Sequence, residues 1–316
     1  METEHVKHPF LAALAALALI LPARAATEAT APPVREAPQP SLDAPDAKHF
    51  LWEVSSLTNK IYLYGTVHAG RKDWFPLPRA VESAFEASAV LVVEADVTDT
   101  DAIAKSAPAM LLKPGDTLKN HVDPADYQRF LKLLPRYGVQ ESQVSNLKPF
   151  LAVSMLVFGE WARNGYVPQM GVDAYLLKKA KAELKPVIEL EGIYAQMDLM
   201  QGMADAESRK LFAGTVVALE DGLTSDQING MVAAWRSGDA PALLQIARKY
   251  NDVVPGAREF EEKFIWSRHE AMVKKLQGFL DDGKERHFVA VGALHLAGER
   301  GLVEMLRKRG YVVVQK

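Results

Sequence analysis

The sequence of 316 residues contains no cysteine. A disulfide bond, a thiolate nucleophile and a cysteine-ligated zinc ion are therefore excluded. No cysteine follows the N-terminal hydrophobic stretch either, so the chain has no site for a lipoprotein-type anchor. Any catalytic or metal-binding chemistry must come from histidine, carboxylate and other side chains.

The chain also lacks a strong net charge and any basic run. Its formal net charge is −3, which argues against nucleic acids and anionic membrane surfaces as main partners. The patterns G-x-S-x-G, H-E-x-x-H, G-x-G-x-x-G and the Walker loop are all missing. The familiar serine hydrolases, zincins and nucleotide-binding enzymes are therefore excluded.

Long hydrophobic runs are absent except for Leu11 to Leu21, which is shorter than the roughly 20 apolar residues of a membrane span. Ala23 and Ala25 follow it in an A-x-A pattern, so residues 1–25 are predicted to be a signal peptide cleaved before Ala26. The alternative is an uncleaved anchor. We expect a periplasmic or secreted protein with no stable membrane span after processing.

The remaining chain divides into a linker and one domain. Residues 26–47 are rich in alanine and proline, which is typical of a flexible or extended tether. Residues 48–316 are long enough for a single large α/β domain. Within it, residues 193–281 show several helical patterns and no convincing strand, so we predict a helical insert there.

Two segments far apart in the chain have the same organisation. Residues 50–55 and 60–65 are short apolar runs that predict a hairpin or two adjacent strands, and Gly65 ends the second run. His68 follows three residues later, and a helical pattern and a buried strand come next. Residues 287–316 repeat this order with Gly292 and His295. The sequence predicts an α/β (α+β) fold, whose central mixed, largely parallel sheet is built from two βαβ-type GxxH halves.

The two glycine-histidine pairs are the first candidate site residues. A glycine at a strand end lets a ligand or a neighbouring backbone approach closely, so Gly65 and Gly292 are predicted to line the substrate site. His68 and His295 would then lie in loops, free to bind a divalent metal or to act as a base. If the two strands are neighbours, both loops leave the sheet at the same edge. The alternative for each histidine alone is a structural hydrogen bond to the backbone.

Carboxylates and one arginine complete the candidate set. Glu94 ends a buried strand, where an open α/β sheet places its ligands, although it could also begin a solvated loop. Glu189 and Glu191 follow another strand and share a face, so one of them could reach the same edge. Asp173 fits a helix N-cap. Arg268 fits either a surface ion pair or carboxylate or phosphate recognition. Three histidines have no repeated context and are not predicted to belong to the site: His121, His269 and His287.

The ordered set of motifs resembles the TraB/GumN family, which is related to the Tiki metalloproteases. The resemblance runs from about Phe50 to Val314. It rests on "YLYGTVHAG", "LVVEADV", "NLKPFLA", "MGVDAYLLKKA", "KPVIELEGIYAQ" and "FVAVGALHLAG". Asp173, Glu191 and Gln196 lie on matching positions of its central block. One departure concerns an Arg-Asn pair, where this chain has Arg268 followed by His269. We expect neither this departure nor the Ala-Gly after His68 to touch the site directly.

The resemblance implies a divalent-metal hydrolase, plausibly a peptidase acting on peptide or protein substrates. In this interpretation His68, His295 and Glu94 are the catalytic residues and bind Mn²⁺, Co²⁺ or Zn²⁺, and Glu191 and Arg268 join the two glycines in substrate binding. Two alternatives stay open. One is a non-catalytic protein that binds a peptide or an envelope component, and the other is a metal-free esterase that uses His and Glu.

Overall fold

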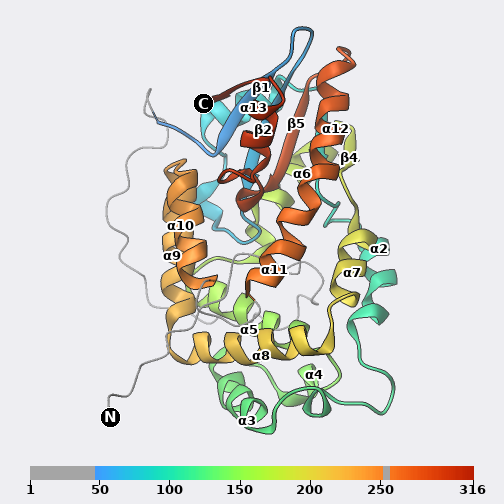
Figure 1. The fold of residues 1–316 in the computed structure, drawn as a ribbon, viewed down its shortest axis with the longest axis vertical. Helices are drawn as coiled ribbons and strands as arrows, with labels where there is room; N and C mark the ends of the chain where they lie inside the picture. Colours follow the sequence, from blue (N-terminus) through green and yellow to red (C-terminus); the bar gives the residue numbers. More distant parts are fainter. Residues whose placement is uncertain (1–46, 252–256) are drawn as a thin grey trace.

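The protein is described by a computed structural model that covers residues 47–251 and 257–316 (Figure 1). The predicted signal peptide and the linker up to residue 46 lie outside these described residues. Within the described ranges, no helix has both the length and the apolar character that crossing a membrane requires.

A six-stranded sheet forms the upper half of the molecule in Figure 1. The strands run in the order β4-β3-β5-β2-β1-β6. Parallel pairs join β2 to β5, β5 to β3 and β3 to β4, whereas β1 is antiparallel to both β2 and β6. The predicted mixed, largely parallel sheet is therefore confirmed. The strand bounds are β1 Leu51–Ser55, β2 Lys60–Thr66, β3 Val90–Val93, β4 Val187–Glu189, β5 His287–Gly292 and β6 Val312–Gln315.

The strands at the centre of the sheet are the most apolar. All four residues of β3 are buried, and so are the first five of β5. Parallel strands covered by helices on both faces are typically continuous hydrophobic runs, as these are. The edge strands β4 and β6 are short and partly exposed, which limits unwanted strand pairing.

Helices connect the strands and form the lower half of the molecule. Helix α1 joins β2 to β3, α6 leads to β4, α12 leads to β5 and α13 joins β5 to β6. The region 193–281 is helical, as predicted, with no strand among its described residues. The α-helices are α1 Arg79–Glu86, α2 Thr100–Ser106, α3 Pro124–Leu133, α4 Glu141–Val144, α5 Pro149–Arg163, α6 Val172–Ala182, α7 Ile193–Gln201, α8 Asp205–Glu220, α9 Leu223–Arg236, α10 Ala240–Asn251, α11 Ala257–Phe264, α12 His269–Asp281 and α13 Leu302–Lys308.

Short 3₁₀ turns mark several junctions between these elements. Two of them matter for the site, because one precedes α12 and the other follows β5. The 3₁₀ segments are η2 Lys72–Trp74, η3 Ala107–Met110, η4 Leu118–Asn120, η5 Leu134–Tyr137, η6 Pro168–Met170, η7 Trp266–Arg268 and η8 Ala293–Leu296.

The carboxyl end of β5 points from the sheet toward the helical half (Figure 1). Helix α5 lies in that half and is apolar on nearly all sides, as expected of a helix inside a core. The aromatic ring of Phe150 at its start packs against Phe264 of α11, with ring centroids 5.9 Å apart. The carboxyl edge of the sheet therefore lies at a boundary between strands and helices, where side chains from both can meet.

Gly65 gives a stability test of this packing. A Cβ at this position would lie 2.4 Å from Phe50 Cδ1 and 3.0 Å from the Cα of Ala293, so Gly65→Ala overpacks the core. We expect it to lower the free energy of unfolding by about 1–3 kcal/mol in urea denaturation. Gly278→Ala is the matched control. Its Cβ would meet nothing within 4 Å, and alanine favours the helix interior by roughly 1 kcal/mol. If the free energy of unfolding of Gly65→Ala were no lower than that of Gly278→Ala, this account would be contradicted.

Candidate active site

The parallel pairing of β2 with β5 places the two GxxH turns side by side. Thr66 is opposite Gly292, so both chains leave the sheet at the same edge. Because β3 pairs with β5 on its other side, Glu94 arrives at this edge as well. A Cβ placed on Gly292 would lie 3.3 Å from His68 Nε2, 3.4 Å from Glu94 Oε1 and 3.6 Å from His295 Cδ2. The three predicted central residues thus surround one glycine, and their catalytic and metal-binding roles stay predictions.

A chain of hydrogen bonds fixes the ring of His295. The carbonyl oxygen of Arg300 can only accept, so His269 Nδ1, 2.7 Å away, carries a proton. Burial, and after it the nearby His295, lower the pKa of His269 to about 3, so His269 is neutral near pH 7. Its Nε2 therefore accepts a hydrogen bond from His295 Nδ1 over 2.8 Å. In the neutral form of His295, the lone pair then lies on Nε2.

His68 lies in close contact with a carboxylate. Its Nδ1 lies 2.7 Å from Asp173 Oδ2, and Asp173 Oδ1 accepts a hydrogen bond from the hydroxyl of Thr66 over 2.6 Å. Burial would lower the pKa of His68, but Asp173 and then Glu94 outweigh it, so the pKa is raised above its ordinary value. Its Nε2 is left facing the space beside Gly292.

Asp173 corrects one sequence-based expectation. The N-cap of α6 is Gly171, and Asp173 lies inside the first turn with a buried side chain. The start of α6 packs directly on the first GxxH turn, because Val172 N–H donates to the carbonyl of Val67 over 2.9 Å. Asp173 is thereby turned toward His68, and the N-cap prediction was wrong.

Glu94 is a buried carboxylate with both oxygens engaged. Its Oε1 accepts the backbone N–H of Gly292 over 2.7 Å, and its Oε2 accepts from Arg268 Nη2 over 2.5 Å. The Oε2 atom also lies 3.5 Å from His295 Nε2. Burial would raise the pKa of Glu94, but the adjacent His295 and Arg268 together lower it well below its ordinary value. The carboxylate is therefore ionised at neutral pH.

Arg268 is a buried guanidinium, so the surface ion pair considered from the sequence is wrong. It lies at the end of η7, and its Nε donates to Glu191 over 2.9 Å while Nη2 contacts both Glu191 and Glu94. Its Nη1 donates to the carbonyl of Phe264 over 2.6 Å. Glu189, the last residue of β4, accepts the backbone N–H of Asp96 instead, so Glu189 and Glu191 divide their roles as expected. The guanidinium recognises carboxylates, here those of the protein itself.

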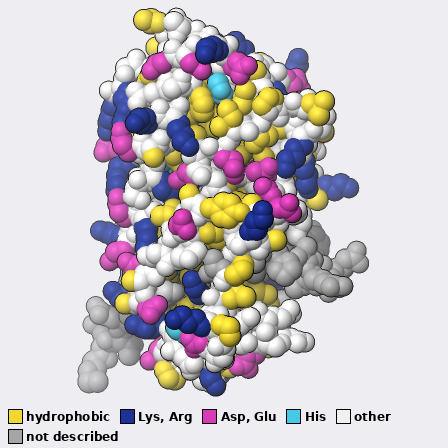
Figure 2. All heavy atoms as spheres, turned by 90° about the vertical axis from the view of Figure 1, so that its right-hand side faces the viewer, with side chains coloured by type: hydrophobic (Ala, Val, Ile, Leu, Met, Phe, Trp, Pro, Cys, Tyr) yellow, Lys and Arg dark blue, Asp and Glu magenta, His cyan; other side chains and the backbone are white. Residues whose placement is uncertain are grey.

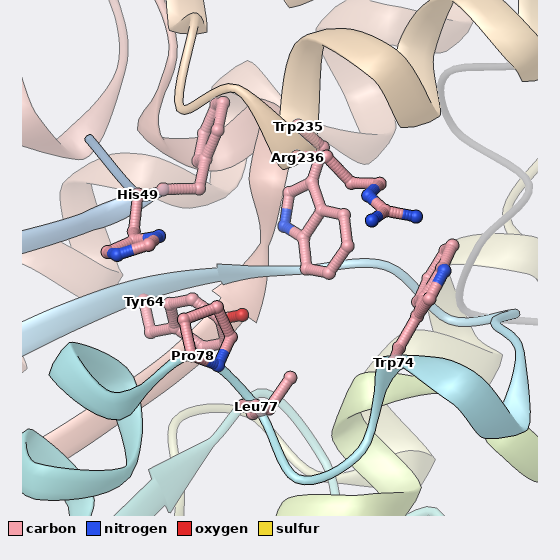
Figure 3. A pocket seen from close by; sticks show the side chains of 8 residues that line it. His49, Tyr64, Trp74, Leu77, Pro78, Trp235 and Arg236 are labelled. Atoms are coloured by element: carbon pink, nitrogen blue, oxygen red, sulfur yellow. The ribbon is translucent and has the colours of Figure 1, made fainter. Parts of the chain in front are cut away.

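Gly65 contacts a different set of residues from those of this cluster. Its carbonyl accepts a hydrogen bond from the indole N–H of Trp235 over 2.7 Å. Beside it lies a small cavity of ≈ 20 Å³, which Figure 3 shows between Trp74, Trp235 and Tyr64. A volume of this size holds about one water molecule rather than a substrate group. The close approach that Gly65 permits is that of Phe50 and the backbone of Ala293.

Two site contacts were missed or discounted in the sequence. His269 has no repeated motif, yet it bonds directly to His295, so the expectation that this departure from the Arg-Asn pair leaves the site untouched was wrong. Thr66, whose hydroxyl binds Asp173, carries no sequence signal of its own. Both belong to segments that the resemblance had marked, and their position beside a predicted histidine was the available signal. Gln196 also reaches the cluster, with its Nε2 3.4 Å from Glu94 Oε2.

The donor set fits a divalent metal in its chemistry. Two imidazole Nε2 atoms and one ionised carboxylate are ligands that Zn²⁺ and Mn²⁺ accept. The Nδ1 atom of each ring faces a polar partner, as in metal-binding histidines. Glu94, however, is held by Arg268, and the described residues contain no group of three or more His, Asp or Glu side chains arranged to hold an ion. The residues therefore fit a divalent metal in their ligand chemistry and in the orientation of the two imidazole rings. To bind an ion, Glu94 would have to leave the guanidinium of Arg268.

The hydrogen-bond chain through His269 predicts the tautomer of His295. In the wild type, ¹⁵N NMR of the side chains is expected to show neutral His295 protonated on Nδ1, with the lone pair on Nε2. His269→Leu removes the acceptor, and we expect a mixture of the two tautomers. His269→Asn supplies an amide oxygen and is expected to keep more of the Nδ1-H form than His269→Leu. A His295 spectrum that is unchanged in His269→Leu would contradict the chain.

The lowered pKa of His269 also predicts a pH dependence of stability. In the unfolded chain this histidine titrates near pH 6.5, so between that pH and about 3 the unfolded state binds the extra proton. The free energy of unfolding must then fall as the pH falls. Between pH 6 and pH 4, we expect the wild type to lose about 2 kcal/mol more than His269→Asn in urea denaturation. Equal losses in the two proteins would show that His269 is not buried in its neutral form.

Comparison with known proteins identifies the family of the chain. A model of the TraB/PrgY/gumN family matches residues 50–315. The uncharacterized protein YbaP of Escherichia coli is 28% identical over 272 residues, covering 82% of this chain and 94% of YbaP. Metalloprotease TIKI1 of Xenopus tropicalis is 24% identical over 314 residues, covering 84% of this chain but 61% of TIKI1. No solved structure matches. The family match spans nearly all of the described chain, which is therefore a member of the TraB/PrgY/gumN family.

Proposed function

We propose that this protein is a metal-dependent hydrolase that cleaves peptide bonds at the site around Gly292. The observation that carries the proposal is the convergence of His68 Nε2, Glu94 and His295 at one sheet edge. Relatives that cover most of this chain are named metalloproteases, which supports peptide or protein substrates and a metal. Because those relatives are longer than the matched region, the activity of this chain is our inference.

The residues would divide the work as follows. His68 and His295 would hold a Mn²⁺, Co²⁺ or Zn²⁺ ion through Nε2, with Glu94 as the third ligand. Glu191 binds the same guanidinium, so Arg268 would keep a carboxylate partner if Glu94 bound the ion. A divalent ion held there would supply a water molecule of lowered pKa for hydrolysis at neutral pH. Arg268, fixed by the carbonyl of Phe264, would stabilise negative charge that develops on the substrate carbonyl.

A metal-free hydrolase is the second candidate, and one observation favours it. The guanidinium of Arg268 already neutralises Glu94, as a metal ion otherwise would. In this version, a neutral His295 or His68 takes a proton from the attacking water. The two candidates differ in their dependence on added metal.

The N-terminal hydrophobic run and the A-x-A pattern support a further part of the proposal, namely that the protein is exported to the periplasm or secreted. These residues lie outside the described structure. The intact mass of the protein from the periplasmic fraction tests export, because cleavage before Ala26 gives a defined mass.

Metal content is the decisive measurement for the first candidate. We expect the purified protein, reloaded with Mn²⁺, Co²⁺ or Zn²⁺, to hold about one ion per chain by elemental analysis. His68→Ala, His295→Ala and Glu94→Ala should each lose the ion while keeping the wild-type circular dichroism. His121→Ala is the matched control, since that imidazole pairs with Asp116 outside the cluster and should not affect metal content.

Cleavage of unstructured casein, with and without a chelator, separates the alternatives. Loss of cleavage on chelation and its return with metal support the metal-dependent enzyme. Cleavage that persists after exhaustive chelation supports the metal-free hydrolase. Stoichiometric casein binding without any product would overturn the proposal in favour of a binding protein.

A further inference from the structure

A groove with four methionines among its lining residues lies next to the candidate site. Its cavity has a volume of ≈ 430 Å³, in the range of typical ligand pockets. It lies between α7, the start of α5 and the segment that follows η3. The side chains that make it apolar are Met110, Leu111, Phe150, Met197, Met200 and Met203. Figure 2, which faces the side of α2 and α7, shows hydrophobic side chains on this face with charged ones around them.

The composition of this methionine groove suits a variable apolar partner. Methionine side chains are unbranched and polarisable, so they adapt to apolar groups of different shape. The polar lining includes both signs of charge, with Lys113 and Lys148 as cations and Asp116 and Asp205 as anions. A rim with both signs of charge can bind the amide groups of a peptide, which both donate and accept hydrogen bonds. A hydrocarbon acyl chain offers no such partner.

Helix α7 connects the groove to the candidate site. Gln196 contacts Glu94, the next residue Met197 lines the groove, and Met200 lies one helical turn further on. The axial rise from Gln196 to Met200 is roughly 6 Å at about 1.5 Å per residue. An extended peptide covers this distance in about two residues.

The opposite wall of the groove also reaches the site. Phe150 lines the groove and packs against Phe264, whose carbonyl accepts the hydrogen bond from Arg268. The groove and the charged cluster thus share walls on two sides, so one extended chain could contact both.

We propose that the methionine groove binds an apolar side chain of the peptide substrate, about two residues from the bond that is cut. This inference rests on the proposed hydrolase function and names its substrate class, namely extended peptides with a bulky apolar residue such as Leu, Met or Phe at that position. The groove would position the backbone of the peptide against the cluster around Gly292.

The first test reads sequence preference directly. A proteome-derived peptide mixture is incubated with the protein, and the products are identified by mass spectrometry. We expect Leu, Met, Ile and Phe to be enriched about two residues from the cleaved bond, on one side only. Cleavage with no apolar preference there would overturn the inference and leave the hydrolase function standing.

Matched variants then assign the preference to the groove. For a peptide with Leu at the preferred position, Met200→Gln should lower kcat/KM by about tenfold or more, with little change for the same peptide carrying Ala there. Met305→Gln is the control, because Met305 is also half-buried but lies on α13 outside the groove. Equal effects on the Leu and Ala peptides would contradict the assignment.

Binding separates the two proposals where no peptide is cut. Fluorescence anisotropy compares the affinities of the fluorescein-labelled Leu peptide and of the same peptide with Ala at that position, for the wild type and for Met200→Gln. Tighter binding of the Leu peptide that Met200→Gln abolishes would keep the groove assignment while the hydrolase fails. No difference between the peptides, or displacement of the label only by decanoate, would overturn the groove as a peptide site.

Discussion

A single buried guanidinium connects the parts of the candidate site. Arg268 contacts Glu94, which follows β3, and Glu191, which follows β4, and it is itself fixed to the carbonyl of Phe264. Burying charged groups is costly unless each has a partner, and removing one member of such a network typically costs about 3–5 kcal/mol. Three segments that are distant in the chain must therefore meet in one arrangement. The same contacts hold Glu94 ionised beside His295.

The two histidines are oriented by different helices, although the strands deliver them together. Asp173 on α6 faces Nδ1 of His68, and His269 on α12 accepts from Nδ1 of His295. In both rings Nε2 is the nitrogen that faces the cluster. The parallel sheet thus determines where the imidazoles lie, and the surrounding helices determine which nitrogen is available for chemistry.

Strand pairing explains why much of the fold could be predicted from the sequence. Apolar runs of strand length that end in glycine predicted β2 and β5, and the repeated order of elements predicted that both turns leave one sheet edge. The histidines and Glu94 follow from that placement alone. The partners of the imidazoles do not, because Asp173 and His269 come from helices whose position depends on tertiary packing. The burial of Arg268 was equally inaccessible, since a helical pattern does not show which end of a helix is covered.

The position of His269 shows how burial makes an unusual residue chemically suitable. The family resemblance leads us to expect an asparagine there, whose amide oxygen accepts a hydrogen bond at every pH. A histidine accepts only while it is neutral, and an exposed imidazole would be partly protonated near pH 6.5. Burial and the adjacent His295 lower the pKa of His269 to about 3, which keeps Nε2 an acceptor throughout the neutral range. The hydrogen bond from His269 Nδ1 to the Arg300 carbonyl also fixes the tautomer of His269. An asparagine amide has no tautomer that must be fixed. His269 can therefore serve as the acceptor for His295, because its burial keeps it neutral.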